Sequence, residues 1–552
     1  MLECLAILLS VFRIVVIPVQ FEDREFTYAP EAFEATAASA QSYLNEQFLG
    51  TVDFSFDITE PVTLKHALQY YGTNRGSVHD TYIFEAVMDA CKAVNGDVDF
   101  TQYDGNEDGK VDCVVLLTAG YSEADTGTLD MIWPQQDWLH KHSQTLVLDG
   151  TLLDGYVVVT ELKEGSNGTP VLNGHGDLCH EIMHIFGLPD FYDIDGEDSG
   201  LVKAMWGSTS LMDRGNRNNG GYSPPGLNSL EMELLGLGTC DTLSKGSHTL
   251  YPLDKDHRYL KAGTDREGEF YLFECRSSAG RDSSIGGEGL LIYHVDMTDS
   301  KAWEDNRLNN DISHPCAYLV EAVPDAKDVS EVFFPQDGAT GFYSDSRPAF
   351  SFWSGSLSRL AITGIHRNAN GSIGFNVSEP VRINSLTAFQ DAVIVTWTLE
   401  GIKGLKYMTV AWFKDGEEVG SSAVEGGDAF TIEHLMPQTE YQIRISVTDN
   451  DDRTFSVTQP VRTKAYVKDV HPFIFLAPEG RNEDGSYTRG TSIPLRVFNV
   501  LDAGNTEWYF DNVRIVPGND SHFTLNNSGT LKAIVFHSDG ATDIIIKEIT
   551  VL

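Results

Sequence analysis

Positive charge is scarce in this sequence. It has 39 lysines and arginines against 81 aspartates and glutamates, which gives a formal net charge of −42 at pH 7. Nucleic acids and anionic membrane surfaces attract proteins through clusters of Lys and Arg, and they repel a surface as acidic as this one. We therefore expect neither as a partner. The same charge favours solubility outside a cell and provides many carboxylates for binding calcium.

Long apolar runs and a regular pattern of cysteines are also missing. After the first twenty positions no run of eighteen or more apolar residues occurs, so we expect no membrane span. The seven cysteines stand at irregular spacings, which predicts buried free thiols rather than a disulfide framework. With 41% hydrophobic residues the chain is nevertheless globular, and its length predicts several domains.

The most informative stretch is CHEIMHIFGLPDFYD, residues 179–193. On a helix, His180 and His184 lie one turn apart on the same face, as two ligands of one metal ion require. Glu181 is placed to take a proton from a water bound to that metal. A glycine that suits the end of a helix follows, and Asp190 can then supply a third ligand. Three protein ligands with one open position are typical of catalytic zinc. A surface helix with two histidines is the alternative, and the extension to Asp190 argues against it.

An acidic loop, DGNEDGKVD, occupies residues 104–112. Its Asp104, Asn106, Asp108 and Asp112 stand at positions 1, 3, 5 and 9, with a glycine at position 6, as in the first part of an EF-hand calcium loop. The glutamate expected at position 12 is replaced by Val115. The loop predicts a calcium or other structural cation site, and a solvated Asx-rich turn is the alternative.

A methionine in a turn-rich segment follows the zinc motif. Met212 lies 22 residues after Asp190, between two glycines of the sequence WGSTSLMDRG. In metzincin-type peptidases a Met-turn forms an apolar floor under the metal. We interpret Met212 in this way, and the alternative is a methionine that fills a gap in the core.

Together these stretches resemble the immune inhibitor A (thuringilysin-like) family of secreted bacterial zinc metallopeptidases. The resemblance is carried by the zinc motif with its Leu-Pro-Asp-x-Tyr-Asp continuation. It extends to the stretches 97–117, 132–133, 206–215, 270–276 and 289–296, and covers about residues 13–378.

The resemblance implies an α+β catalytic domain of zincin- and metzincin-like fold, with a mixed sheet and an active-site helix. It implies zinc held by His180, His184 and Asp190, Glu181 as general base and acid, and Met212 as the Met-turn. A tyrosine that assists the oxyanion is common among metzincins, and Tyr222 is a candidate. The implied substrates are proteins or peptides.

The start of the chain departs from the family pattern. Secreted members usually carry a signal peptide and a pro-segment, whereas residues 1–12 are apolar but lack a basic region and a small-residue cleavage site. We expect an extracellular or cell-surface location, although an export signal is not clearly present in this chain.

The zinc domain, residues 13–378, is expected to contain a recognisable order of elements. Strands are predicted at 13–22, 52–58, 111–117 and 156–160, the last at a sheet edge, and helices at 30–48, 80–94 and 176–186.

The sequence changes character near residue 379. Residues 379–465 predict a β-sandwich, and Leu435-x-Pro437-x-Thr439-x-Tyr441 resembles the tyrosine corner of fibronectin type III modules. Residues 466–552 predict a second, Ig-like sandwich. Neither contains a cluster of reactive side chains, so we favour a spacer or surface-docking role over carbohydrate binding.

The sequence thus predicts a secreted zinc-dependent endopeptidase. Two alternatives stay open. One is a cell-surface or extracellular binding protein with a latent metal domain, and the other is a zinc amidase that acts on cell-wall peptides.

Overall fold

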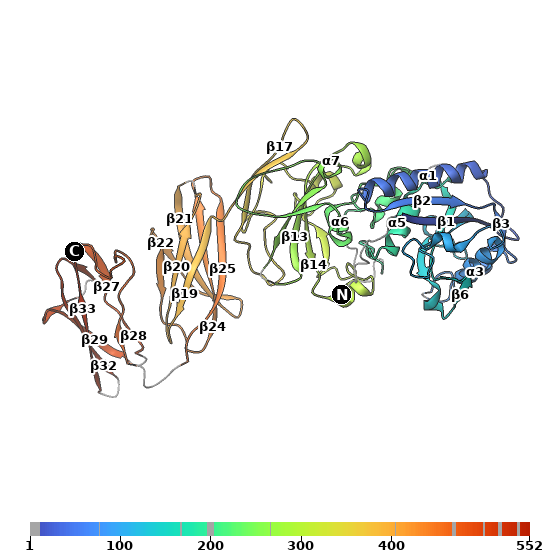
Figure 1. Ribbon diagram of the computed structural model, residues 1–552. Coiled ribbons are helices and arrows are strands. Elements are labelled where there is room, and N and C mark those ends of the chain that lie inside the picture. Colours follow the sequence, from blue (N-terminus) through green and yellow to red (C-terminus); the bar gives the residue numbers. More distant parts are fainter. Residues whose placement is uncertain are drawn as a thin grey trace. The chain divides into compact units, whose positions relative to one another are not determined.

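The computed structural model describes residues 11–76, 78–165, 168–195, 204–264, 266–402, 404–465, 471–500, 503–516, 521–537 and 541–552. Most of the apolar segment 1–12 therefore lies outside the described residues. The chain forms two compact units, Met1–Thr340 with Gly364–Phe375, and Gly341–Thr363 with Asn376–Leu552 (Figure 1).

A seven-stranded mixed sheet begins the first unit. Its order is β2-β1-β4-β8-β5, with β3 paired to β1 and β9 paired to β8. Strands β1 to β4 and β8 pair in parallel, and β5 and β9 pair antiparallel with β8. The strands are β1 (Val11–Gln20), β2 (Asp53–Ile58), β3 (Val62–Thr63), β4 (Val114–Tyr121), β5 (Gln135–Trp138), β8 (Gly155–Glu164) and β9 (Pro170–Leu172).

Helices cover both faces of this sheet, because the apolar residues of β1 alternate between two cores. Ile14 and Val16 pack in one core with helices α1 (Pro30–Gln47) and α5 (Gly176–Ile185). Val15 and Ile17 pack on the opposite face with α3 (Ile83–Val94). The helix predicted at 30–48 is confirmed as α1, and the apolar face of this segment is buried: Phe33, Ala37, Ala40, Tyr43, Leu44 and Phe48.

The predicted edge strand at 156–160 is wrong. The segment belongs to β8, which has β4 on one side and β5 on the other, so it lies inside the sheet. The prediction missed β5 because its sequence, QQDW, is polar and carries no apolar alternation. The small elements of this region are α2 (Leu68–Tyr71), α4 (Glu123–Thr126), β6 (Leu146–Leu148), β7 (Thr151–Leu153) and the 3-10 helices Phe100–Tyr103 and Leu139–His142.

A five-stranded sheet of order β10-β12-β13-β14-β15 forms the rest of the first unit's core. Every residue of β13 and β14 is buried, and apolar side chains of both strands share a core with α5 and α6. The elements are α6 (Ser229–Leu235), β10 (Thr239–Thr242), β11 (Gly246–Leu250), α7 (Leu253–Asp256), β12 (Arg258–Gly263), β13 (Glu269–Arg276), β14 (Gly289–Asp296), α8 (Ser300–Glu304), β15 (Ala317–Leu319) and the 3-10 helices Arg214–Gly221, Gly280–Ser284 and Val329–Val332.

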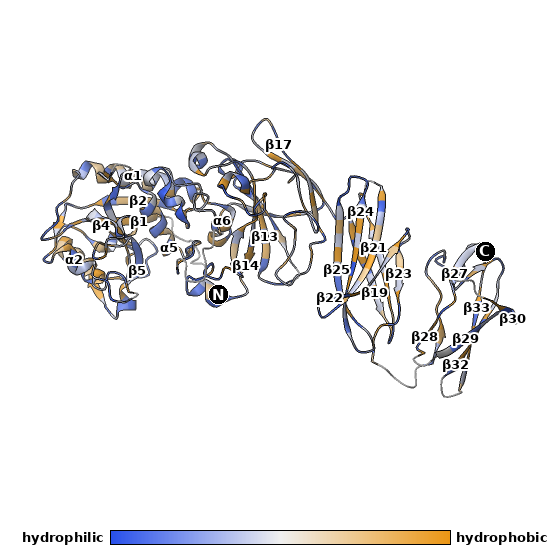
Figure 2. Ribbon diagram, turned by 180° about the vertical axis from the view of Figure 1, so that it is seen from behind, coloured by the Kyte–Doolittle hydropathy of each residue, from blue (hydrophilic) through white to orange (hydrophobic). Residues whose placement is uncertain are grey.

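Two β modules make up most of the second unit. In the first, the sheets β19-β20-β23 and β22-β21-β24-β25 enclose one core and so form a β-sandwich. Apolar and polar residues alternate along β24, and Figure 2 colours this strand by hydropathy. The predicted tyrosine corner is present, because the buried Tyr441 hydroxyl accepts a hydrogen bond of 3.0 Å from the Met436 backbone N–H.

The last module holds the sheets β26-β28, β27-β31 and β30-β29-β32-β33, around a core that includes Ile493, Trp508 and Leu531. The remaining strands of the chain are β16 (Gly341–Phe342), β17 (Ala361–Arg367), β18 (Ile373–Ser378), β19 (Val381–Ala388), β20 (Val393–Leu399), β21 (Leu405–Lys414), β22 (Glu417–Val424), β23 (Ala429–Ile432), β24 (Glu440–Asp449), β25 (Thr454–Arg462), β26 (Phe473–Ile474), β27 (Thr491–Pro494), β28 (Val497–Phe498), β29 (Ala503–Phe510), β30 (Val513–Ile515), β31 (His522–Leu525), β32 (Gly529–His537) and β33 (Thr542–Ile549).

The predicted fold class is wrong in its main part, the α+β zincin- or metzincin-like catalytic domain, whereas the first of the two sandwiches predicted after it is present. Strand accounts for 41% of the chain and helix for 17%, and the strands are spread over many small sheets. The prediction gave too much weight to the helices of the first 235 residues. Beyond them the described chain has short α-helices of four and five residues, α7 and α8, while β-branched and aromatic segments form strands.

In the described residues no helix has the length and apolar character needed to cross a bilayer.

Candidate metal centre

Helix α5 carries the two histidines of the motif, as predicted. It packs its apolar side, including Cys179 and Met183, into the core and ends where Gly187 adopts a φ of 87° that reverses the chain. His180 and His184 lie one turn apart, and their ring centroids are 4.9 Å from each other. The turn after the helix therefore brings the following residues back towards both imidazoles.

Asp190 completes a group of three ligand atoms. Its Oδ1 lies 3.0 Å from His180 Nε2 and 3.4 Å from His184 Nε2. Within the part of the chain that the structure describes, these residues are the one set of three His, Cys, Asp or Glu whose ligand atoms all lie within 4.8 Å of one another. The exposed fractions of His180 and Asp190 are 4% and 7%, so this is an interior site.

The donor atoms fit a cation. His180 Nδ1 donates to the Leu211 carbonyl at 2.8 Å, and His184 Nδ1 donates to the Leu188 carbonyl at 2.7 Å. With their Nδ1 atoms so engaged, the rings turn Nε2 towards Asp190 Oδ1, and each Nε2 carries a lone pair when its ring is neutral. That oxygen is buried and has no properly directed hydrogen bond. In the neutral state the three atoms suit a metal ion, which would replace the proton that His180 otherwise holds, and two nitrogens with one oxygen suit zinc.

The close contact between the imidazoles and the carboxylate shifts the pKa values of His180 and Asp190. Burial would lower the pKa of His180, but its contact with Asp190 and the charge of Glu181 raise it to about 9. Burial would raise the pKa of Asp190, but the two imidazoles hold it below its usual range. The three groups thus stabilise one another's charged forms, and a divalent cation would take over that role.

Glu181 faces the same cavity as His180 and Asp190. It is buried, and burial raises the pKa of its carboxyl to about 7, while the nearby imidazoles oppose this rise. A carboxylate with a pKa near neutrality can both accept and return a proton at physiological pH.

The turn that contains Met212 lies against the motif. Met212 is fully buried in the core that also holds Cys179 and Met183. Its carbonyl accepts a hydrogen bond from the Phe191 N–H at 2.8 Å, and its own N–H donates to Glu231 Oε1 at 3.0 Å. Since the preceding carbonyl, that of Leu211, receives the His180 Nδ1 proton, this turn fixes one of the predicted ligands.

Two residues of the site were not predicted. Asn306, 116 positions downstream, donates from Nδ2 to Asp190 Oδ2 at 2.7 Å. Tyr192 lies within the motif, lines the cavity and stacks on His180 with centroids 6.5 Å apart. Burial and the charges of Asp190 and Glu181 raise the pKa of its hydroxyl well above the usual value. Asn306 has no local sequence signal, whereas the position of Tyr192 two residues after a ligand is one.

Tyr222, the sequence-based candidate for the oxyanion role, is placed elsewhere. Its hydroxyl donates to the Leu172 carbonyl at 2.9 Å, and about half of its surface is exposed. It is not among the residues that line the cavity around the ligands. Tyr192 is therefore the tyrosine that the structure brings to the site.

The cavity beside the ligands has a volume of about 640 Å³, which is enough for several residues of an extended peptide. One part of its wall carries Arg214 and Arg217, and another carries His79 and Trp133. The lining residues outside the motif are His79, Ala124, Trp133, Pro134, Asp177, Ile194, Asp213, Arg214, Asn216, Arg217 and Asn306.

Asp80 supports the wall at Trp133. Its exposed fraction is 1%, and its Oδ2 accepts hydrogen bonds from the Trp133 N–H at 2.8 Å and from Gln135 Nε2 at 2.6 Å. Burial raises the pKa of Asp80 to about 7, because the charged carboxylate loses hydration. The two hydrogen bonds favour the charged form and so offset this rise only in part.

We expect Asp80→Asn to change how stability depends on pH. A carboxyl whose pKa is raised in the folded state favours folding most below its unfolded pKa of about 4, and this contribution is lost as pH rises through 7. The melting temperature of the variant, relative to the wild type, should therefore be higher at pH 8 than at pH 5. Thermal unfolding at both values tests this, with the exposed Asp53→Asn as control. An equal difference at the two pH values would show that Asp80 does not titrate in this range.

The predicted calcium loop folds around its own backbone. Asp104 accepts hydrogen bonds from the N–H groups of Asp108 and Gly109, and Asp112 accepts one from Gly105. Gly109 has a φ of 84°, as the sharp turn of such a loop requires. Asp104, Asp108 and Asp112 do not form a three-ligand group among the described residues, and Asn106 accepts from Asp108. Calcium binding here stays a prediction.

Calcium should stabilise the protein if this loop binds it. Burial, together with the charges of Asp104 and Asp108, raises the pKa of Asp112 to about 7, so the loop carries uncompensated negative charge that a cation would neutralise. We expect calcium at ten times its Kd to add about 1.4 kcal/mol to the free energy of unfolding. The Asp104→Asn, Asp108→Asn double variant should lose this gain, and Glu107→Gln, an exposed residue at a non-ligand position, should keep it. Equal calcium responses in both variants would contradict the site.

No protein-family model matches the sequence, and no curated protein matches it. Among solved structures, fibronectin(III)-like modules of Clostridium thermocellum CbhA match at 13% identity, over 31% of this chain and 94% of theirs, with a TM-score of 0.13. A computationally redesigned β-sandwich protein matches at 17% identity, over 16% of this chain and 92% of its own, with a TM-score of 0.14. Similarities of this size contribute nothing to the argument about the metal centre, which depends on the geometry above.

Proposed function

We propose that this chain is a secreted zinc-dependent endopeptidase, as its resemblance to the immune inhibitor A family implies. The observation that carries the proposal is the group of His180, His184 and Asp190, of which His180 and Asp190 are buried, and whose facing atoms leave Asp190 Oδ1 without a hydrogen bond. Glu181 and a cavity of peptide size adjoin this group.

His180, His184 and Asp190 would hold the zinc. When bound, the metal supplies Lewis acidity towards a peptide carbonyl and a water molecule. The carbonyls of Leu211 and Leu188 hold the two imidazoles in the tautomer that presents Nε2. The rest of the chemistry is proton transfer by the protein.

Glu181 performs that transfer. Its carboxylate accepts a proton from the attacking water and returns it to the leaving nitrogen of the cleaved peptide bond. Its buried position favours this role, because the carboxyl pKa near 7 leaves both protonation states accessible. Tyr192, next to the same cavity, is positioned to orient the substrate carbonyl.

The substrates would be proteins or peptides in the extracellular space or at the cell surface. The cavity's polar wall of arginine, asparagine and histidine side chains supplies donors for a peptide backbone. The C-terminal β modules would serve as a spacer or as a surface for docking.

Digestion of casein by the full-length protein tests the proposal. We expect cleavage that a zinc chelator abolishes and added zinc restores. A panel of cell-wall muropeptides run alongside would identify an amidase if these are cleaved and casein is not. Bound zinc without cleavage of either substrate would favour the binding protein with a latent metal domain.

A further inference from the structure

The two carboxylate oxygens of Asp190 have different surroundings. Oδ1 faces His180 Nε2 and His184 Nε2 at 3.0 and 3.4 Å and accepts no directed hydrogen bond. Oδ2 instead accepts a hydrogen bond of 2.7 Å from Asn306 Nδ2. One oxygen is thus presented to the metal position, and the other is already engaged by the protein.

The orientation of the Asn306 amide is determined by its partners. The backbone N–H of Asp190 donates a hydrogen bond of 2.7 Å to the Asn306 side chain. Of the two amide atoms only the oxygen can accept a hydrogen bond, so the atom facing this N–H is Oδ1. The amino group of Asn306 must therefore point at Asp190 Oδ2. The Asn306 side chain thus makes two hydrogen bonds to Asp190, one to its backbone and one to its carboxylate. Rotating the amide by 180° would break both.

The segment that carries Asn306 is firmly anchored. It follows α8, where the indole N–H of the buried Trp303 donates to the Asp296 carbonyl at the end of β14. Three residues further on, the fully buried Asn309 donates from Nδ2 to the carbonyls of Phe191 and Ala317, both at 2.8 Å. Asn309 thus holds the residue next to Asp190, while Asn306 holds Asp190 itself.

We propose that Asn306 is a positioning residue that restricts Asp190 to coordination through one oxygen. This inference rests on the proposed zinc function. A carboxylate can bind a metal through one oxygen or two, and the second mode would occupy the position that a catalytic site keeps open for water. By engaging Oδ2, Asn306 prevents the second mode and keeps the ligand set at two nitrogens and one oxygen.

Three variants separate this role from a structural one. Asn306→Ala removes both hydrogen bonds, and Asn306→Ser keeps a short donor that partly restores the one to Oδ2. Asn309→Ala is the matched control, since its amide anchors the same segment without touching a ligand. Loss of a group that orients a metal ligand typically lowers metal affinity about 10- to 100-fold.

The readout is the visible absorption of the cobalt-substituted full-length protein, together with zinc affinity by competition with a chelator. Four-coordinate cobalt absorbs much more strongly than five-coordinate cobalt. We expect a strong spectrum for the wild type and Asn309→Ala, and a weakened spectrum with lower zinc affinity for Asn306→Ala. Asn306→Ser should lie in between. A wild-type spectrum and affinity in Asn306→Ala would overturn the inference.

X-ray absorption at the zinc edge of the wild type tests the same point without a variant. One carboxylate oxygen at bonding distance is the expected result, and two from the same carboxylate would refute the role of Asn306 even if the variants fail to fold. Absence of zinc from the wild type is a different outcome, because it would remove the proposed function on which the inference rests.

Discussion

Replacing Glu181 by glutamine should abolish peptide hydrolysis while zinc stays bound. The ligand atoms belong to His180, His184 and Asp190, so the substitution leaves the metal site intact. Glutamine has nearly the same shape as glutamate but cannot accept the proton of the attacking water. Loss of a general base costs a factor of about 10² to 10⁴ in rate, and here the same residue also returns the proton.

The measurement is kcat/KM on a fluorogenic peptide, together with the zinc content of the same preparation. Glu233→Gln is a suitable control, because Glu233 pairs with Lys261 and Tyr259 and does not line the cavity. Cleavage that persists at the wild-type rate in pure Glu181→Gln would remove this residue from the mechanism. Loss of zinc along with activity would mean that Glu181 supports the ligands rather than the chemistry.

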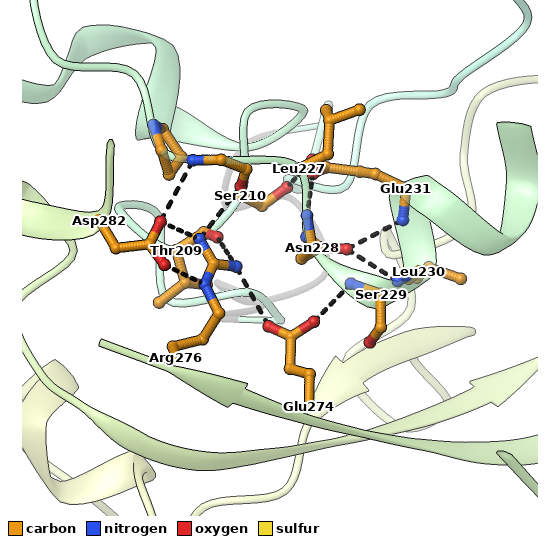
Figure 3. Close-up of polar contacts among 12 residues, drawn as sticks. Thr209, Ser210, Leu227, Asn228, Ser229, Leu230, Glu231, Glu274, Arg276 and Asp282 are labelled. Atoms are coloured by element: carbon orange, nitrogen blue, oxygen red, sulfur yellow. Dashed lines mark hydrogen bonds and ion pairs between the residues drawn. The ribbon is translucent and has the colours of Figure 1, made fainter. Parts of the chain in front are cut away.

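Arg276→Met should cause the largest loss of stability. The guanidinium of Arg276 is buried, with an exposed fraction of 1%, and binds Asp282 at 2.6 Å and Glu274 at 3.1 Å (Figure 3). It also donates to the Gly226 carbonyl at 3.0 Å. Removing one partner of a buried ion pair leaves uncompensated charge in the interior and costs about 3–5 kcal/mol.

This network connects the second sheet of the first unit to the turn that contains Met212. Glu274, on β13, accepts a hydrogen bond from the N–H of Ser229 at the start of α6 (Figure 3). It also accepts one from the Tyr293 hydroxyl. Glu231 of the same helix accepts from the Ser210 hydroxyl at 2.7 Å and from the Met212 N–H. We therefore expect Arg276→Met to loosen the turn that fixes His180 as well as to lower stability.

Guanidinium unfolding followed by tryptophan fluorescence measures the effect. Arg258→Met is the matched control, since its ion pair with Asp241 has the similar length of 2.8 Å but is about half exposed on both sides. Exposed pairs contribute about 0–1 kcal/mol. If the two variants unfold at the same denaturant concentration, the buried network does not stabilise this unit.

The group of residues at the candidate metal centre could be predicted from the sequence because it is local. His180, His184 and Asp190 lie within eleven positions, and helix periodicity followed by a glycine turn is enough to bring them together. Asn306 could not be predicted, because its contact with Asp190 depends on how β14 and α8 pack 116 residues downstream.

The fold was predicted well where the apolar pattern is strong and poorly where it is not. The alternating residues of β1 and the apolar face of α1 determined their elements. β5 has no such pattern and was missed, which turned β8 into a false edge strand. The fold class was wrong because the balance of strand and helix depends on the second half of the chain, where the helices are few and short. The residue pattern of the predicted calcium loop shows which side-chain oxygens are available. It does not show whether those oxygens point towards one common position that a cation could occupy.

Metal analysis of the purified full-length protein is the most direct test of the zinc site. We expect one zinc per chain in the wild type, removed by a chelator and taken up again on addition of zinc, and little or none in His184→Ala. A wild-type protein that neither contains nor takes up zinc would contradict the assignment of His180, His184 and Asp190 as a metal centre.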